Sequence, residues 1–130
     1  LSGWYPGEFA PEDATREWQW TQKLATLSFR NPRKDVTFFL EYDTRADLFT
    51  DPRQQITIYS GQTPIQTIAV ESLGTELRRL PIAATQLGTG EMAELRIEVD
   101  RTFIPAKLPG GSADFRELGI RVYHAYVEAR

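Results

Sequence analysis

The sequence of 130 residues contains no cysteine, one histidine and one methionine. The absence of cysteine excludes a disulfide framework, a thiolate zinc site and a cysteine nucleophile. It does not identify the compartment, because many exported bacterial proteins also lack cysteine. A single histidine cannot supply the histidine pair of a zinc site. We therefore expect neither a metal centre of these kinds nor a cofactor.

The chain also lacks an excess of basic residues and any long apolar run. Its 15 Lys and Arg against 18 Asp and Glu give a formal net charge of −3, so nucleic acids are not expected partners. No stretch approaches the ~20 apolar residues of a membrane span, and residues 1–6 lack the regions of a signal peptide. We expect one domain over residues 1–130, excised from a longer protein and with no direct membrane insertion.

What the sequence does contain is a series of short strand patterns separated by Pro and Gly turns. Apolar and polar residues alternate in several segments, which are 17–20, 23–30, 36–43, 55–59, 65–70 and 93–100. Residues 17–20 and 23–30 are expected as two strands. Ser60-Gly61 opens a hairpin turn, because Gly61 can adopt a positive φ.

Two further segments carry proline and are expected at the margins of the sheets. Residues 75–82 are expected as an edge strand, because Pro81 argues against a central one. Residues 3–9, which Pro6 and Gly7 interrupt, are expected as an extended segment laid over the body.

The last quarter of the chain is expected to supply the central strand. Apolar residues occupy the even-numbered positions up to Val122 and the odd-numbered positions from Tyr123 to Val127. This pattern predicts that both faces of the strand are largely covered. No segment has a helical period longer than about two turns. The predicted fold class is all-β: a two-sheet antiparallel β-sandwich of jelly-roll kind.

Several short motifs carry a family resemblance across nearly the whole chain. They are Gly3-Trp-Tyr-Pro6, Trp20-Thr21, Ser60-Gly61, Val99-Asp-Arg-Thr-Phe-Ile-Pro105 and Asp114-x-Arg-Glu-Leu-Gly-Ile120. Together they resemble the β-sandwich domains appended to bacterial membrane glycosyltransferases and related cell-surface polysaccharide proteins. The layout is similar to galactose-binding-like jelly rolls. The resemblance implies an extracytoplasmic accessory module, periplasmic or at the cell surface, that binds carbohydrate.

Aromatic residues concentrate in the first 20 positions, where Trp4, Tyr5, Trp18 and Trp20 are candidate ligand-binding residues. The C–H faces of a pyranose stack on exposed aromatic planes, while carboxylates, amides and Arg bind the hydroxyls. The same rings could instead belong to the core. That alternative is favoured for Trp20 and stays open for the other three.

Asp114, Arg116 and Glu117 lie where a loop enters the last strand and are also candidate binding residues. As a site, Arg116 would bind a sugar hydroxyl or carboxylate. As structure, which we favour, it would be held between carboxylates and tie the Gly110-Gly111 loop to the sheet.

A calcium site formed by Asp43, Asp47 and Asp51 is a weaker hypothesis. Hard cations take clustered oxygens, but these residues lack the Gly-centred spacing of a calcium loop. Arg45 and Arg53 also lie among them. A solvated loop is preferred.

Nothing in the sequence points to catalysis. His124 lies within the last strand, where alternation groups it with Val122 and Tyr126 as a sheet residue rather than a general base. There is no nucleophile elbow and no phosphate loop. The leading interpretation is a noncatalytic carbohydrate-binding module attached to surface-polysaccharide or glycosyl-transfer machinery. A structural domain that binds protein and a small carbohydrate-active enzyme with a spatially assembled carboxylate pair remain alternatives.

Overall fold

A computed structural model describes residues 2–10, 12–50, 52–71 and 74–130. In these ranges the chain forms the strands β1 (Ser2–Trp4), β2 (Glu8–Ala10), β3 (Asp13–Arg30), β4 (Val36–Asp43), β5 (Gln55–Ser60), β6 (Thr63–Ala69), β7 (Glu76–Ile82), β8 (Met92–Val99) and β9 (Arg121–Ala129). Short helical turns are η1 (Ala46–Leu48), α1 (Ala84–Leu87) and η2 (Pro105–Lys107). All strand pairs are antiparallel, and the predicted all-β class is confirmed.

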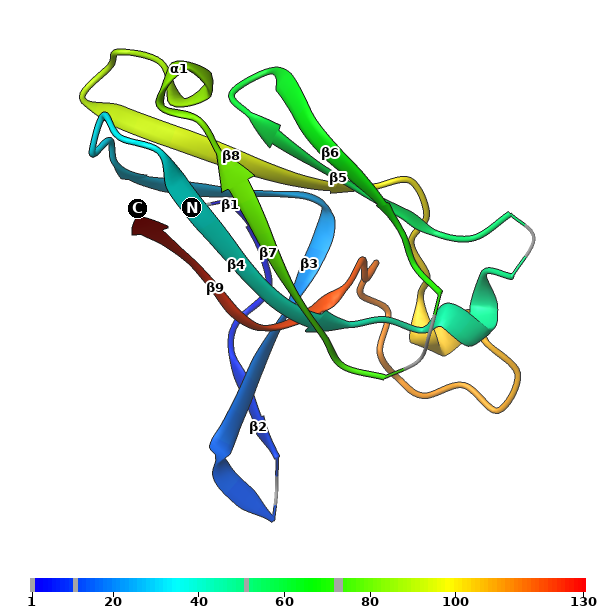
Figure 1. Ribbon diagram of the computed structural model, residues 1–130. Coiled ribbons are helices and arrows are strands. Elements are labelled where there is room, and N and C mark those ends of the chain that lie inside the picture. The colour runs from blue at the N-terminus through cyan, green and yellow to red at the C-terminus, as the bar shows by residue number, and fades with distance from the viewer. Residues whose placement is uncertain (1, 11, 51, 72–73) are drawn as a thin grey trace.

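The strands lie in two layers that share β3 (Figure 1). Their order is β6-β5-β8-β3-β9-β4-β7, and β1 and β2 also pair with β3. Residues 24–30 of β3 pair with β8, whereas Gln19 and Trp20 pair with β9. The strand bends sharply between these two stretches, so each half belongs to a different layer (Figure 1). The predicted sandwich architecture agrees with this arrangement.

The prediction of two separate strands over 17–20 and 23–30 is wrong, because β3 is continuous through Thr21. The Thr21 N–H donates to the carbonyl of Ile120, and the Gly119 N–H donates to the carbonyl of Thr21. Backbone hydrogen bonding therefore continues through the bend, where neither Pro nor Gly ends the strand.

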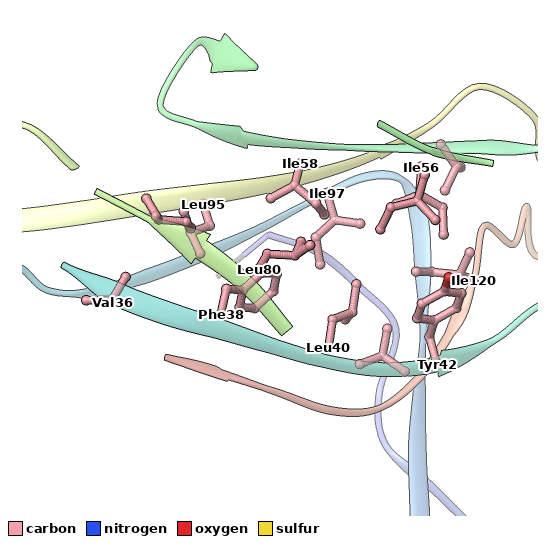
Figure 2. Close-up of a cluster of buried hydrophobic side chains, with 14 of the residues drawn as sticks. Val36, Phe38, Leu40, Tyr42, Ile56, Ile58, Leu80, Leu95, Ile97 and Ile120 are labelled. Carbon is pink, nitrogen blue, oxygen red and sulfur yellow. The ribbon is translucent and has the colours of Figure 1, made fainter. Parts of the chain in front are cut away.

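Alternating side chains from the two layers meet to form the core (Figure 2). Phe38 and Leu40 of β4 face Ile58 and Ile97 of the opposite layer, and all four are fully buried. Each such side chain contributes about 1.5–3 kcal/mol when it is removed from water. In β8 the alternate residues 93, 95, 97 and 99 are buried, as the pattern predicts.

The predicted turns and edge strand are confirmed. The hairpin between β5 and β6 turns at Gly61, whose φ is 57°. β7 ends the strand order, and Pro81 lies in it opposite Thr37. The N-terminal segment is extended, as expected, and forms β1 and β2 against β3.

The last strand is central, as predicted, but the expectation that both its faces are covered is wrong. Glu41 pairs with His124 and Tyr42 with Val122, so Tyr123 is an extra residue in a β-bulge. Val122 faces the core before the bulge, and the odd-numbered residues Ala125 and Val127 face it after the bulge. His124 and Tyr126 face outward and are exposed, and His124 does not share the side of Val122.

None of the helices in the described ranges is long and apolar enough to cross a membrane.

Candidate functional site

A groove opens where β3 separates from β9. Only Gln19 and Trp20 of β3 pair with β9; beyond the bend the two strands run in different layers. The groove consists of two hollows of about 410 and 400 Å³ that share Leu27 and Ala125. The first hollow, which we call the aromatic pocket, is lined by Trp4, Tyr5, Pro6, Gln19, Leu27, Val122, Tyr123 and Ala125.

β1 fixes the two N-terminal aromatic residues at the pocket. The indole N–H of Trp4 donates to the carbonyl of Thr26 at 2.9 Å, and the ring packs partly buried against the core. The Tyr5 N–H donates to the carbonyl of Trp20 at 3.0 Å. Nε2 of Gln19 donates to the carbonyl of Tyr5 at 3.1 Å. Trp4 and Tyr5, both predicted as binding residues, therefore form one wall of the pocket.

None of the predicted triplet Asp114, Arg116 and Glu117 lines the pocket. Arg116 and Glu117 instead contact Tyr5, which does line it. Arg116 donates from Nε and Nη2 to Asp114 at 3.0 and 2.8 Å, and from Nη1 to Glu8 at 3.3 Å. Its guanidinium carbon lies 5.2 Å from the centre of the Tyr5 ring. The Tyr5 hydroxyl donates to the carbonyl of Glu117 at 2.8 Å.

These contacts define what Arg116 does. Its hydrogen bonds lower the pKa of Asp114, so that this carboxyl stays ionised. With its donors directed at two carboxylates, Arg116 ties its loop to the N-terminal segment and holds Tyr5 in place.

Trp18 and Trp20 lie outside the lining of the aromatic pocket and surround Arg121. The guanidinium carbon of Arg121 lies 5.1 Å from the centre of the Trp18 ring and 5.6 Å from that of Trp20. Trp20 and Phe103 also pack in a T-shaped arrangement, with 5.6 Å between ring centres. Both indoles, which sequence reasoning considered for ligand binding, thus contact Arg121 and stay partly exposed.

Asp43 completes this second cluster. Arg121 donates from Nε and Nη2 to the two oxygens of Asp43 at 2.8 and 2.6 Å, which raises the pKa of the guanidinium. The Tyr123 hydroxyl donates to the same carboxylate at 2.9 Å. Tyr123 is also a lining residue of the aromatic pocket and therefore joins the arginine cluster to the groove.

The acidic residues considered for calcium make other contacts. Asp43 is held by Arg121, and Asp47 accepts two hydrogen bonds from the exposed Arg45. Asp51 lies outside the described residues. In the part of the chain that the structure describes, no three His, Asp or Glu residues gather as metal ligands.

Sequence reasoning missed Gln19, Tyr123 and Arg121. A signal existed for Gln19, because strand alternation places its side chain on the other face of the strand from Trp18 and Trp20. A signal existed for Tyr123 as well, because the apolar positions switch from even to odd between Val122 and Tyr123; the switch was interpreted as two covered faces instead of a bulge. The role of Arg121 depends on Asp43, which is 78 residues away in the sequence.

Neither the family models nor the curated proteins include a match to this sequence. A solved structure with a similar fold is that of a novel family GH115 4-O-methyl-α-glucuronidase, BtGH115A, described as specific for decorated arabinogalactans. The TM-score is 0.56 at 13% sequence identity, and the similarity covers 88% of this chain but only 14% of that one. This likeness shows the fold: the sandwich of this chain is similar to part of a carbohydrate-active enzyme.

Proposed function

We propose that this domain is a noncatalytic carbohydrate-binding module of a larger protein, and that the aromatic pocket holds the sugar. The observation that carries the proposal is the composition of this pocket, whose lining includes the aromatic residues Trp4, Tyr5 and Tyr123 together with Gln19. Its volume of about 410 Å³ falls within the range of small-molecule sites.

The binding chemistry follows from these side chains. The C–H face of a pyranose packs on an aromatic ring, and an amide exchanges hydrogen bonds with the hydroxyls. The rings are held before the sugar arrives, Trp4 through Thr26 and Tyr5 through Glu117. A ring that is already ordered loses little side-chain entropy on binding, although an open, shallow site gives a weak affinity.

Two observations support a binding role over hydrolysis. The carboxylates of Asp43 and Asp114 are each paired with an arginine. A general acid for glycoside hydrolysis needs a raised pKa, whereas the pKa of Asp114 is lowered. The similar fold within a family GH115 glucuronidase adds a carbohydrate-active context. As such an accessory module, the domain would serve surface-polysaccharide or glycosyl-transfer machinery outside the cytoplasm.

The test is an NMR titration of the domain with bacterial polysaccharide fragments and with arabinogalactan oligosaccharides that carry 4-O-methylglucuronic acid. We expect saturable shifts at residues of the aromatic pocket. Removing a stacking ring by Tyr123→Ala should weaken binding about tenfold, the equivalent of ~1.4 kcal/mol. Tyr123→Phe keeps the ring and should retain most of the affinity.

The control is Phe115→Ala, because this ring is 73% exposed and lies outside the lining of the pocket. It should bind like the unmodified chain. No shift with any fragment at millimolar concentration, or equal binding by Tyr123→Ala and the unmodified chain, would contradict the proposal.

A structural or assembly role is the second candidate function. It is favoured by a specific observation, the edge of β9 that no described strand pairs with past Val122.

A further inference from the structure

β9 has one paired edge and one free edge. β4 pairs with it along its whole length, from Arg121 to Ala129. On the other side, β3 pairs only with Arg121 and Val122. Past Val122, none of the described strands pairs with this edge. The second hollow of the groove, about 400 Å³, lies beside it and is bordered by Leu27, Phe29 and Tyr126 among others.

The register shows which backbone groups are free. Arg130 donates its N–H to the carbonyl of Asp35 at 2.9 Å and therefore faces β4. Backbone groups of an antiparallel strand alternate between its two neighbours, so 124, 126 and 128 also face β4. The N–H and C=O groups of residues 125, 127 and 129 consequently point to the free edge. Such a row of unpaired groups is a template for another strand.

The other edges of the sheets carry features that block strand addition. β6 contains Pro64 and β7 contains Pro81, and each lacks one N–H for that reason. The edge of β3 that faces away from β8 is partly covered by β1, which pairs with Thr21 and Thr26. Residues 124–129 contain neither proline nor glycine. Compared with the edges of β6 and β7, this edge has no such protection.

We infer that the free edge of β9 binds the same edge of a second copy of this chain, antiparallel and around a two-fold axis at Tyr126. The two sheets then continue through the dimer in the order β7-β4-β9-β9-β4-β7. In this register residue 125 faces residue 127 of the partner, and these pairs exchange the free backbone hydrogen bonds.

The side chains that this register brings together are complementary. On the outer face, His124 lies opposite Glu128 of the partner subunit, and Tyr126 lies opposite the partner's Tyr126. On the inner face, Ala125 lies opposite Val127 of the partner subunit, beside the apolar groove. An aromatic pair and an apolar pair each stabilise antiparallel strands. His124 already contacts Glu41 of its own chain, with 2.7 Å between Nδ1 and Oε1, so its pairing with Glu128 adds little. This self-complementarity, together with the free backbone groups, favours a second copy as the occupant.

A single-cysteine variant tests the register directly, because the chain has no cysteine of its own. Tyr126 is 46% exposed and lies on the proposed axis. Facing residues of a non-hydrogen-bonded pair are about 4.5 Å apart at Cα, which a disulfide can span. Tyr126→Cys should therefore form a covalent dimer under mild oxidation. Leu77→Cys, at an exposed position on the edge strand β7, should stay largely monomeric.

Analytical ultracentrifugation tests the free edge itself. The unmodified chain should form a dimer as its concentration is raised to about 100 μM, within the range of weak natural complexes. Ala125→Pro removes one N–H at the free edge without removing a hydrogen bond to β4, and should shift the dimer to monomer. Leu77→Pro is the matched control. Residues 77 and 81 are both odd-numbered positions of β7, so the backbone N–H of residue 77 points to the same outer edge as the position of Pro81. It should still form a dimer.

A charge exchange covers the case in which Ala125→Pro fails to fold. Tyr126→Lys should raise the dissociation constant of the dimer, because two like charges then face each other on the axis, and mixing this variant with Tyr126→Glu should restore association. A chain that stays monomeric, a dimer that survives Ala125→Pro, or a Tyr126→Cys variant that does not cross-link would overturn the inference. None of these outcomes depends on sugar binding by Tyr123.

Discussion

At the scale of single residues, arginines determine where the aromatic side chains lie. Arg121 sits among Trp18, Trp20 and Tyr123 and is paired with Asp43, whose side chain is only 11% exposed. A guanidinium presents its donors in a fixed plane and stacks on aromatic faces at the same time. One half-buried cation therefore orders three rings.

The Arg121–Asp43 pair should contribute measurably to stability, whereas the exposed Arg45–Asp47 pair should not. Asp43→Ala leaves Arg121 without its partner and should lower the free energy of unfolding by about 1.5–3 kcal/mol. Asp47→Ala removes a pair that is also short but exposed, and it should cost less than about 0.5 kcal/mol. Urea denaturation followed by tryptophan fluorescence measures both. Equal losses in the free energy of unfolding for the two variants would show that the burial of Asp43 does not strengthen its ion pair.

At the scale of elements, regular strands could be predicted and interrupted ones could not. β4 and β8 occupy the predicted positions because one face of each is uniformly apolar. The bulge at Tyr123 reverses the alternation of β9, and from sequence alone this looks like a strand that is covered on both faces. β1 depends on a similar local feature, because Gly3 has a φ of 81° and packs directly on β3.

Two glycines with positive φ should respond differently to alanine. At Gly61 an added Cβ meets no atom within 4 Å, so Gly61→Ala should cost only the conformational strain of about 1 kcal/mol. At Gly3 the Cβ would lie 1.9 Å from the carbonyl oxygen of Leu24. We expect Gly3→Ala to release β1 from β3 and to open the aromatic pocket at Trp4. Hydrogen exchange should then show lost protection at Tyr5, whose N–H bonds to Trp20, and retained protection there would contradict this account.

At the scale of the whole molecule, the bend of β3 connects the two layers. Thr21 lies in this bend and is fully buried. Its backbone pairs with Gly119 and Ile120, and its hydroxyl oxygen accepts a hydrogen bond from the N–H of Ile120 at 3.1 Å. Because both layers share this strand, neither layer can unfold without disturbing the other. We therefore expect one cooperative transition.

Thr21→Val tests the bend with little change in volume. The valine methyl cannot accept the hydrogen bond from Ile120, and a buried N–H without a partner costs about 1–3 kcal/mol. The transition should move to lower urea concentration and stay single for probes in both layers. Thr67→Val, on the exposed face of β6, should change the free energy of unfolding by less than about 0.5 kcal/mol. Separate transitions for the two layers would disprove the cooperative coupling.

The sequence by itself determined the features that depend on neighbouring residues. Alternation and turn residues were sufficient for the all-β class, for β4 and β8, for the Gly61 hairpin and for the edge position of β7. The attachment of Arg116 to Asp114 was also predictable, because the two residues are close in the chain.

Only the tertiary structure decided which residues share a site. The bend of β3 opens the groove, and the bulge of β9 places Tyr123 in its lining beside Trp4 and Tyr5. Both features depend on contacts between segments far apart in the sequence, such as those of Thr21 with Ile120 and of Glu41 with His124. Local periodicity carries no record of such contacts, because it reports which face of a strand is apolar and not which strand lies beside it.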